Sequence, residues 1–260
     1  YCFSWKDGAV CADAADHFFP ISIIEKESIL KECQDAGIDG ITTIASDTAV
    51  LTVNYVAGKM NLISNSDEYS QTTTNKFLMR QCFEAHNVPS PKYVKIAAES
   101  GTGQVSGLQF PVIVKPTDRS GSRGVEKVCT PEDIPAAVAR AQKESFNHEA
   151  IMEEYVSGKE ISVEAISYGG KHHILQITDK VTTGEPFFVE LAHHQPSCLP
   201  QSIQDNVKAV VLKALNALHI EYGASHSELK ITESGDIRVI EIGARMGGDF
   251  IGSDLVRLST

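Results

Sequence analysis

Apolar residues in the first 65 positions follow two different spacings. Short continuous apolar runs predict buried strands at 1–5, 40–44 and 62–63. Apolar residues three and four apart predict helices over 25–36 and 47–60. Gly37 suits the position after the first helix, and Asp47 suits the N-cap of the second. This βαβαβ order predicts a parallel sheet with helices on its faces, without the G-x-G-x-x-G fingerprint of a dinucleotide site.

A helix predicted over 72–86 leads into two prolines, Pro89 and Pro91. Paired prolines after a helix mark a hinge. The sequence therefore predicts an N-terminal domain (1–70), a linker helix with hinge (71–91) and a larger domain (92–260). Within the larger domain we expect a lid subdomain over about 92–155 and a central sheet subdomain over about 156–260. The glycine-bearing stretch 99–107 predicts a polar loop.

A candidate phosphate cradle follows a buried strand predicted at 110–114. Lys115 stands at the end of that strand, and a turn of small residues at 120–124 precedes the next strand at 125–128. Glycine lets backbone N–H groups converge on an anion, and lysine supplies a point charge for phosphate. The stretch lacks the G-x-x-x-x-G-K-[ST] spacing of a P-loop, and these residues alone fit an ordinary hairpin turn about as well.

Further along, Thr130 is predicted to cap a helix with a buried face of small apolar residues. Two strands then follow within 150–167, joined at 156–159. A junction of this kind can offer an adenine its backbone hydrogen bonds, and Glu160 could accept hydrogen bonds from ribose hydroxyls. Nothing local requires this, because an isolated Glu160 is equally consistent with a solvated carboxylate.

The most informative stretch is a predicted antiparallel hairpin with strands at 225–232 and 237–242. If Thr232 pairs with Ile237, then Glu228 and Glu241 face each other with β-carbons roughly 5 Å apart. Like charges at that distance destabilise a sheet unless something positive lies between them. A hard divalent cation such as Mg²⁺, which takes oxygen ligands and shares them with phosphates, fits that place. The alternative is a pair of solvated glutamates on an edge hairpin.

Composition narrows the class of partner. The 260 residues include 23 Lys+Arg and 34 Asp+Glu, a formal net charge of −11. Nucleic acids and anionic membranes are bound through clustered basic residues, so neither partner is expected. No apolar run reaches the roughly 18 residues of a membrane span, and no charged-then-apolar leader opens the sequence. The six cysteines are scattered without paired spacing, which predicts reduced thiols and a cytoplasmic protein.

Four ordered motifs resemble the ATP-grasp superfamily: FPVIVKP, SGSRGV, EEYVSGKEISVE and ELKITESGDIRVIEIGARMGG. The preceding stretch, from ASDTAVLTVNYVAGKMNL to NKFLMRQCFEAHNVPSPKY, resembles the pre-ATP-grasp domain and linker helix of carbamoyl-phosphate-synthase-like and amino-acid-ligase members. The resemblance covers nearly the whole chain. It implies an α/β fold in which a partial, Rossmann-like pre-ATP-grasp domain precedes an ATP-grasp domain pair, truncated at both ends. It also implies ATP and Mg²⁺ as cofactors, with Mn²⁺ as an alternative metal.

The resemblance implies roles for individual residues. Lys115 matches the lysine that contacts the α-phosphate, and Arg245 an arginine that stabilises the acyl-phosphate or the incoming carboxylate. Glu228 and Glu241 match the two magnesium carboxylates. The other implied nucleotide contacts, which include the lid, the adenine hinge and the ribose-binding acid, are Lys76, Ser120, Gly121, Ser122, Arg123, Gly124, Val125, Glu153, Glu154, Tyr155, Val156, Glu160 and Lys180. The implied substrate pocket contains Glu190, His193, His194, Gln195 and Gly247.

Two details qualify these roles. Neighbouring residues of a strand point to opposite faces, so only one of His193 and His194 is expected to enter the site. No zinc site is expected here, because no third His or Cys stands at ligand spacing from them. Family members commonly carry E-x-N-P-R, whereas here Gly243 stands where an asparagine often completes the shell of the second metal. Either Glu241 bridges two ions with water filling the gap, or only one ion binds tightly.

The leading functional hypothesis is an ATP-dependent ligase that joins a small carboxylate to an amine and acts on amino acids. Such an enzyme forms an acyl-phosphate and ADP, and the amine then displaces the phosphate. The alternatives are a nucleotide-binding fragment without independent catalysis and a metal-dependent hydrolase. A homo-oligomer is compatible with each of the three.

Overall fold

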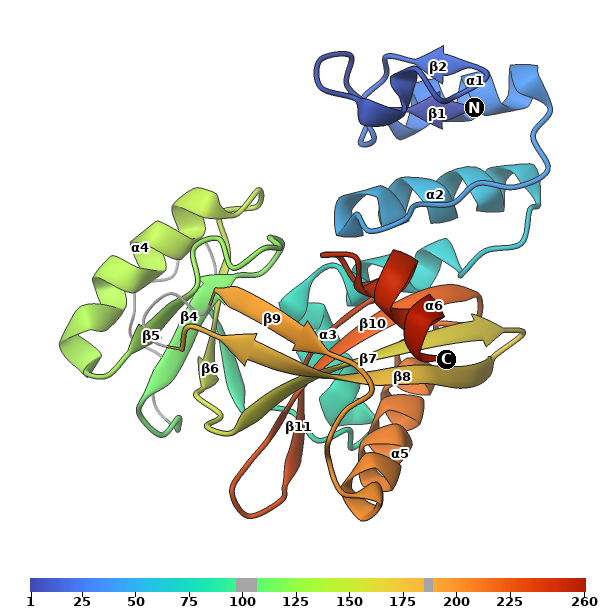
Figure 1. Cartoon of the computed structure of the whole chain (residues 1–260). Coiled ribbons are helices and arrows are strands. Elements are labelled where there is room, and N and C mark those ends of the chain that lie inside the picture. The colour runs from blue at the N-terminus through green and yellow to red at the C-terminus, as the bar shows by residue number, and fades with distance from the viewer. Residues whose placement is uncertain (97–106, 185–188) are drawn as a thin grey trace.

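The structure, a computed structural model, describes residues 1–96, 107–184 and 189–260. The predicted polar loop at 99–107 lies almost wholly outside the described residues. Two larger sheets lie side by side below the N-terminal residues, and helices pack against both (Figure 1). The predicted mixed α/β fold is confirmed. None of the helices in the described ranges is long and apolar enough to cross a membrane.

The N-terminal residues form two helices and a small parallel sheet. Strands β1 (Cys2–Phe3) and β2 (Phe18–Phe19) pair in parallel. Helix α1 (Lys26–Ala36) ends at Gly37, whose φ of 61° is left-handed, as predicted for the residue after the helix. Helix α2 (Asp47–Met60) packs against α1. Two 3₁₀ helices lie at η1 (Val10–Ala12) and η2 (Asp67–Thr73).

Two predictions for this region are wrong. The stretches 40–44 and 62–63 form no strands. The carbonyl of Ile44 accepts one hydrogen bond from the N–H of Met246 at 3.0 Å, but neither stretch is part of a sheet among the described residues, and Ile44 and Ile63 are exposed. The N-cap of α2 is Ser46, whose hydroxyl accepts a hydrogen bond from the N–H of Ala49 at 3.3 Å. Asp47 is instead the first helical residue, which leaves its carboxylate free for a contact outside the helix.

The four-stranded sheet has the order β3-β6-β4-β5. Its strands, antiparallel to their neighbours, are β3 (Tyr93–Ile96), β4 (Val112–Pro116), β5 (Glu126–Val128) and β6 (Ala150–Glu154). After a short turn η3 (Pro131–Asp133), helix α4 (Ile134–Glu144) covers this sheet with its predicted apolar face. Thr130 stands at the predicted cap position, but its side chain makes no cap hydrogen bond.

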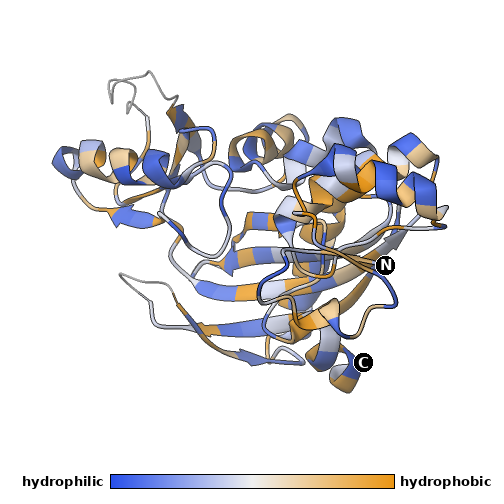
Figure 2. Cartoon of the chain, turned by 90° about the horizontal axis from the view of Figure 1, so that it is seen from above, coloured by the Kyte–Doolittle hydropathy of each residue, from blue (hydrophilic) through white to orange (hydrophobic). Residues whose placement is uncertain are grey.

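The five-stranded sheet has the order β11-β10-β7-β8-β9 and carries the largest core. Its strands are β7 (Lys159–Tyr168), β8 (Lys171–Thr182), β9 (Glu190–His194), β10 (Gly223–Ile231) and β11 (Ile237–Gly243). Helices α3 (Lys76–Ala85) and α5 (Gln201–Ala217) supply buried apolar residues to its core. A π-helical turn η4 (Ile251–Leu255) and α6 (Val256–Ser259) close the chain. Hydrophilic and hydrophobic residues alternate along these strands (Figure 2), which leaves one face of the sheet polar.

The hairpin β10–β11 confirms the pairing of Glu228 with Glu241, but by a different route from the one predicted. Ile231, not Thr232, faces Ile237. A β-bulge between Glu228 and Leu229 then shifts the register by one residue. The loop is thus longer than predicted, and the bulge compensates for it, so the two carboxylates still share one face of the sheet.

Candidate active site

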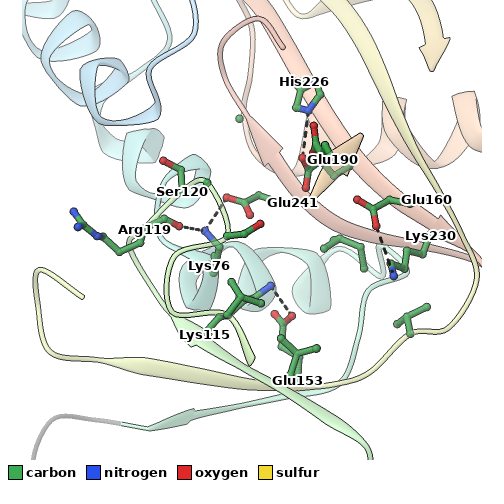
Figure 3. Close-up of a pocket in the computed structure, with 18 of the residues that line it drawn as sticks. Lys76, Lys115, Arg119, Ser120, Glu153, Glu160, Glu190, His226, Lys230 and Glu241 are labelled. Carbon is green, nitrogen blue, oxygen red and sulfur yellow. Dashed lines mark hydrogen bonds and ion pairs between the residues drawn. The ribbon is translucent and has the colours of Figure 1, made fainter. Parts of the chain in front are cut away.

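A cleft of about 210 Å³ lies between the two larger sheets (Figure 3). Both sheets and the linker helix line it. Its residues are Lys76, Ile113, Lys115, Arg119, Ser120, Gly121, Ser122, Val125, Glu153, Tyr155, Val156, Glu160, Glu190, His226, Glu228, Lys230, Ile240, Glu241, Gly243 and Arg245. Most of the predicted site residues are therefore brought together, although Arg123, Gly124, Glu154, Lys180, His193, His194 and Gly247 do not line the cleft.

On the side of the four-stranded sheet, Lys115 is held by a buried ion-pair network. The Nζ of Lys115 lies 2.7 Å from Glu153, and the Nε of Arg80 lies 2.9 Å from the other oxygen of that carboxylate. Arg80 also donates to the carbonyl of Ile240, 2.6 Å away on β11. Burial alone would raise the pKa of Glu153, but Arg80 and Lys115 hold it below its ordinary value. The lysine is thus placed before any nucleotide binds.

The linker helix contributes a second lysine. Asn75 caps α3 by accepting hydrogen bonds from the N–H groups of Phe77 and Leu78 at 3.0 and 3.2 Å, which places Lys76 at the first helical position. The Nζ of Lys76 donates to Glu241 at 2.8 Å and to the carbonyl of Arg119 at 2.6 Å (Figure 3). Lys76 therefore joins the hairpin β10–β11 to the start of the glycine turn.

The glycine turn reaches the cleft through its first half. Ser120, Gly121 and Ser122 line the cleft together with Val125. Gly121, Ser122 and Gly124 all have positive φ angles, of 69°, 54° and 68°. Successive residues in such conformations direct backbone N–H groups to one side, as in anion-binding turns. Arg119 enters the cleft just before the turn, and the sequence reasoning missed it.

The predicted hinge is divided between the cleft and the surface. Tyr155 and Val156 line the cleft, whereas Glu154 accepts a hydrogen bond from the N–H of Gln109 and does not line it. Glu153 faces the cleft, but its side chain is the counter-ion of Lys115. The N–H groups of Glu154 and Tyr155 already donate to the carbonyls of Lys92 and Pro111 at 3.0 Å, so the backbone of Val156 is the part we expect a nucleobase to contact. Glu160 lies beyond it, 3.7 Å from Lys230.

On the side of the five-stranded sheet, acidic side chains surround Lys180. Its ammonium contacts Glu160 at 3.2 Å, Glu228 at 3.0 Å, and also Glu190. Burial would lower the pKa of Lys180, but Glu228, Glu160 and Glu190 raise it above its ordinary value. With its side chain 1% exposed, Lys180 neutralises carboxylates, and the phosphate contact predicted for it stays a prediction.

Glu228 and Glu241 have the chemistry of a Mg²⁺ site. They are cross-strand partners, their side chains are 30% and 27% exposed, and both line the cleft. Burial disfavours the charged form of Glu228, but His226 and Lys180 hold its pKa well below the ordinary value. Both side chains thus direct carboxylate oxygens to the space that phosphates would enter, and oxygens of this kind are the ligands that Mg²⁺ prefers.

His226 is a site residue that the sequence reasoning missed. It stands two positions before Glu228 on β10, so period-two alternation places both side chains on the same face. Its Nδ1 bonds to Glu164 at 2.5 Å, and its Nε2 lies 3.4 Å from Glu228. Burial would lower the pKa of His226, but Glu164 and Glu228 raise it to about 9. The alternation itself was the signal that could have found it.

Arg245 is held by Asp47, the first residue of helix α2. Its Nε and Nη2 donate to the two carboxylate oxygens of Asp47 at 2.8 and 3.0 Å. A β-carbon at position 243 would lie 2.6 Å from Asp47 Oδ1, so only glycine leaves room for this ion pair. Asp47 therefore lies where a side chain at position 243 would stand. Whether Glu241 bridges two ions or only one ion binds tightly stays a prediction.

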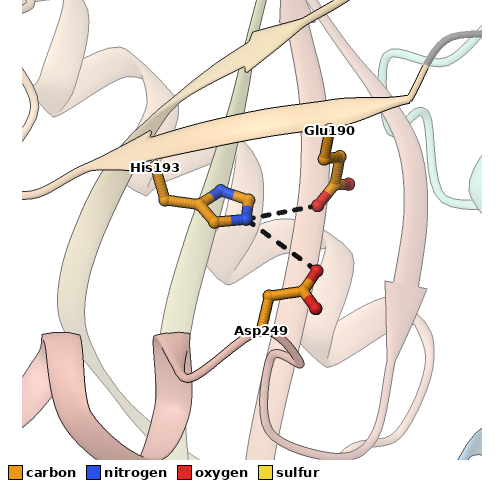
Figure 4. Close-up of side chains that lie close together, drawn as sticks. All are labelled: Glu190, His193 and Asp249. Atoms are coloured by element: carbon orange, nitrogen blue, oxygen red, sulfur yellow. Dashed lines mark ion pairs between the residues drawn. The ribbon is translucent and has the colours of Figure 1, made fainter.

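The predicted substrate residues divide into two groups. Glu190 lines the cleft, and His193 lies behind it with Nε2 at 3.3 Å from Glu190 and 3.9 Å from Asp249 (Figure 4). One carboxylate oxygen of Glu190, one ring nitrogen of His193 and one carboxylate oxygen of Asp249 all lie within 4.8 Å of one another. His194 is exposed, in agreement with the expectation that only one histidine turns inward. Gly247 contacts the buried pair Glu164–His226.

This cleft, with a placed lysine on one sheet and paired carboxylates on the other, has the features of a metal–nucleotide site. Residues 108–254, more than half of the chain, match the ATP-grasp domain. The chain belongs to the ATP-grasp family.

Three named relatives are ligases. The chain is 24% identical over 250 residues to D-alanine–D-alanine ligase of Lactococcus lactis, covering 91% of this chain and 68% of that protein. It is 24% identical over 245 residues to alanine–anticapsin ligase of Bacillus subtilis, covering 85% and 51%. The crystal structure of an L-amino acid ligase from Bacillus licheniformis superposes with a TM-score of 0.82 at 24% identity, covering 94% and 59%. The chain thus spans between about half and two thirds of the length of these proteins.

Proposed function

We propose that this chain is the nucleotide-binding part of an ATP- and Mg²⁺-dependent ligase that joins a carboxylate to an amine through an acyl-phosphate, with amino acids as substrates. The observation that carries the proposal is the opposition of charges across the cleft. Lys115 and the glycine turn lie on one side, and the paired carboxylates Glu228 and Glu241 lie on the other. Nucleotide phosphates bearing a divalent cation match both sides. The amino-acid class rests on the named ligases that the chain resembles.

Each side of the cleft has a part in the reaction. A substrate carboxylate attacks the γ-phosphate of ATP, which brings two anions together. Lys115, Lys76 and Arg245 are the cations that offset the charge on the transferred group. Bound Mg²⁺ would add charge neutralisation between the phosphates, held by Glu228 and Glu241.

The second step is the attack of an amine on the acyl-phosphate, which releases phosphate and forms the amide. Water would hydrolyse the intermediate, so the site must exclude it. The turn 120–124 is the segment we assign to covering the phosphates. Glu190, with His193 behind it, lies where an amine could be held by hydrogen bonds. No side chain of the chain acts as a nucleophile in this scheme.

The test is a screen of the protein with Mg·ATP and pairs of amino acids, with separate measurement of ADP, AMP and phosphate. We expect ADP and phosphate only when an acid and an amine are both present. Lys115→Ala should reduce turnover roughly 10²- to 10³-fold. Lys92→Ala, which removes an exposed lysine just before β3, should not. Release of AMP, or substrate turnover without ATP, would contradict the proposal.

One other outcome supports a different function. If ATP raises the melting temperature while no pair of acid and amine releases phosphate, the chain is a nucleotide-binding module that does not catalyse on its own. The observation that favours this second candidate is Gly243, which stands where an asparagine often completes the shell of the second metal.

A further inference from the structure

Glu164 is a buried carboxylate in the middle of the five-stranded sheet, and the mechanism above does not use it. It lies on β7, is 3% exposed and faces His226 across the strand pair β7–β10. A charge in this position is costly unless its oxygens are bonded. Both are: Oε1 accepts from His226 Nδ1 at 2.5 Å, and Oε2 accepts from the backbone N–H of Gly247 at 3.0 Å.

The first contact leads to the metal-binding hairpin. His226 spans the space between two carboxylates, because its other nitrogen, Nε2, lies 3.4 Å from Glu228. The imidazole ring is rigid, so its orientation at Glu164 determines where Nε2 meets Glu228. Glu228 in turn has only one other cationic neighbour within ion-pair distance among the described residues, Lys180 at 3.0 Å. Glu164 therefore influences the position of one of the two carboxylates assigned to Mg²⁺.

The second contact leads to the turn that carries Arg245. Gly247 stands two residues after Arg245 and comes close to the buried pair. A β-carbon there would lie 2.9 Å from His226 Nδ1 and 3.0 and 3.1 Å from the two oxygens of Glu164. Glycine alone permits this approach, and the hydrogen bond from its N–H then fixes the turn against β7.

We propose that Glu164 is a positioning residue of the nucleotide site, which sets Glu228 through His226 and the Arg245 turn through the N–H of Gly247. This inference rests on the proposed function. It goes beyond it by assigning roles to Glu164, His226 and Gly247, to which the proposed function assigns none. Outer partners of this kind usually change metal affinity or activity 10- to 100-fold when they are removed.

The decisive variant is Glu164→Gln, which keeps the size of the side chain and one acceptor oxygen but cannot bond to both partners as before. Manganese binding is measured by electron paramagnetic resonance in the presence of a non-hydrolysable ATP analogue, and turnover is measured separately. We expect Mn²⁺ affinity to fall about 10-fold or more, with kcat lowered as well and the melting temperature changed by only a few degrees. Glu233→Gln, an exposed carboxylate in the β10–β11 loop, is the matched control and should behave like the wild type.

Gly247→Ala disturbs the same cluster from the side of the Arg245 turn, because its β-carbon would crowd both Glu164 and His226. It should lower kcat, because the Arg245 turn is displaced, with a smaller change in the KM for ATP. It also decides the question if Glu164→Gln does not fold. Wild-type Mn²⁺ affinity and wild-type kcat in both variants would overturn the proposal. If the wild-type protein binds Mn²⁺ and the ATP analogue but joins no amino acids, the proposed function fails, while the Mn²⁺ affinity of Glu164→Gln still tests the positioning role.

Discussion

The two walls of the cleft, one formed by the four-stranded sheet and one by the five-stranded sheet, differ in how their charged side chains are paired. On the four-stranded side, Arg80, Glu153 and Lys115 compensate one another, and their side chains are almost fully buried. On the five-stranded side, Glu228 and Glu241 remain about a third exposed or less, and protein cations contact each of them. The first wall is complete without a ligand. The second keeps carboxylate oxygens that a divalent cation can reach.

This difference shows how a site can be rigid and still receive a charged ligand. A closed ion-pair network gives a fixed position to Lys115 at a cost that its partners offset. Carboxylates held only by lysines and a histidine can exchange those partners for a metal ion. Four predictions test the contrast, in order of decreasing expected effect.

Arg80→Met should be the most damaging change to stability. It leaves Glu153 buried with one cation in place of two and removes the bond to the carbonyl of Ile240. We expect a loss of roughly 3–5 kcal/mol in the free energy of unfolding, measured by urea denaturation. Arg140→Met, which breaks an exposed pair with Glu126 in the same part of the fold, should cost about 0–1 kcal/mol. Equal losses in the two variants would refute the claim that the first wall depends on its buried network.

Glu241→Gln should affect the reaction and not the fold. Glutamine preserves an acceptor for Lys76, which now lies 2.8 Å from the carboxylate, but it is a weaker ligand for Mg²⁺. We expect kcat to fall roughly 10²- to 10³-fold, with little change in melting temperature. ADP release at saturating ATP is the measurement. A melting temperature that drops as far as in Arg80→Met would show that this carboxylate serves the fold.

His226 makes the second wall dependent on pH. Its pKa of about 9 lies above the ordinary value of 6.5, so the protonated ring stabilises the folded state. That contribution is complete below pH 6.5 and is lost as the pH rises through 9, and it amounts to at most about 3 kcal/mol. Urea denaturation of the wild type and of His226→Gln at pH 6 and at pH 9.5 measures it. The gap between the two proteins should narrow at the higher pH, and a constant gap would contradict the assignment.

Asp47→Asn should have the smallest effect on turnover, because it weakens the pairing of Arg245 with one partner, Asp47. We expect kcat to fall about tenfold, with an almost unchanged KM for ATP. Gly243→Ala should cause a similar loss, since its β-carbon would lie 2.6 Å from Asp47 Oδ1. In an Asp47→Ala background, Gly243→Ala should cost less. Strict additivity of the two changes would show that they act independently.

Local patterns were sufficient for much of the fold. The apolar spacing of 25–36 and 47–60 predicted α1 and α2 to within a residue or so, and Gly37 ends α1 as expected. The predictions of strands at 40–44 and 62–63 were wrong, because a strand needs a neighbouring strand to pair with and the spacing of apolar residues does not show whether one is there. The division of the chain at 70 and 91 stays a prediction.

The sequence by itself determined several of the residues that line the cleft. Lysine at the end of an apolar strand, small residues in a turn and alternating positions on a hairpin are local features, so Lys115, Ser120 and the pair Glu228–Glu241 could be named from them. Even there the bulge at Leu229 was needed to restore the predicted pairing.

Only the tertiary structure decided which partners these residues have. Asp47 and Arg245 are 198 positions apart, and Lys76 and Glu241 are 165 apart. Glu164 meets Gly247 across 83 positions. No periodicity reaches over such distances, because these contacts exist only when separate elements pack together, and the charge of each group depends on what that packing places beside it.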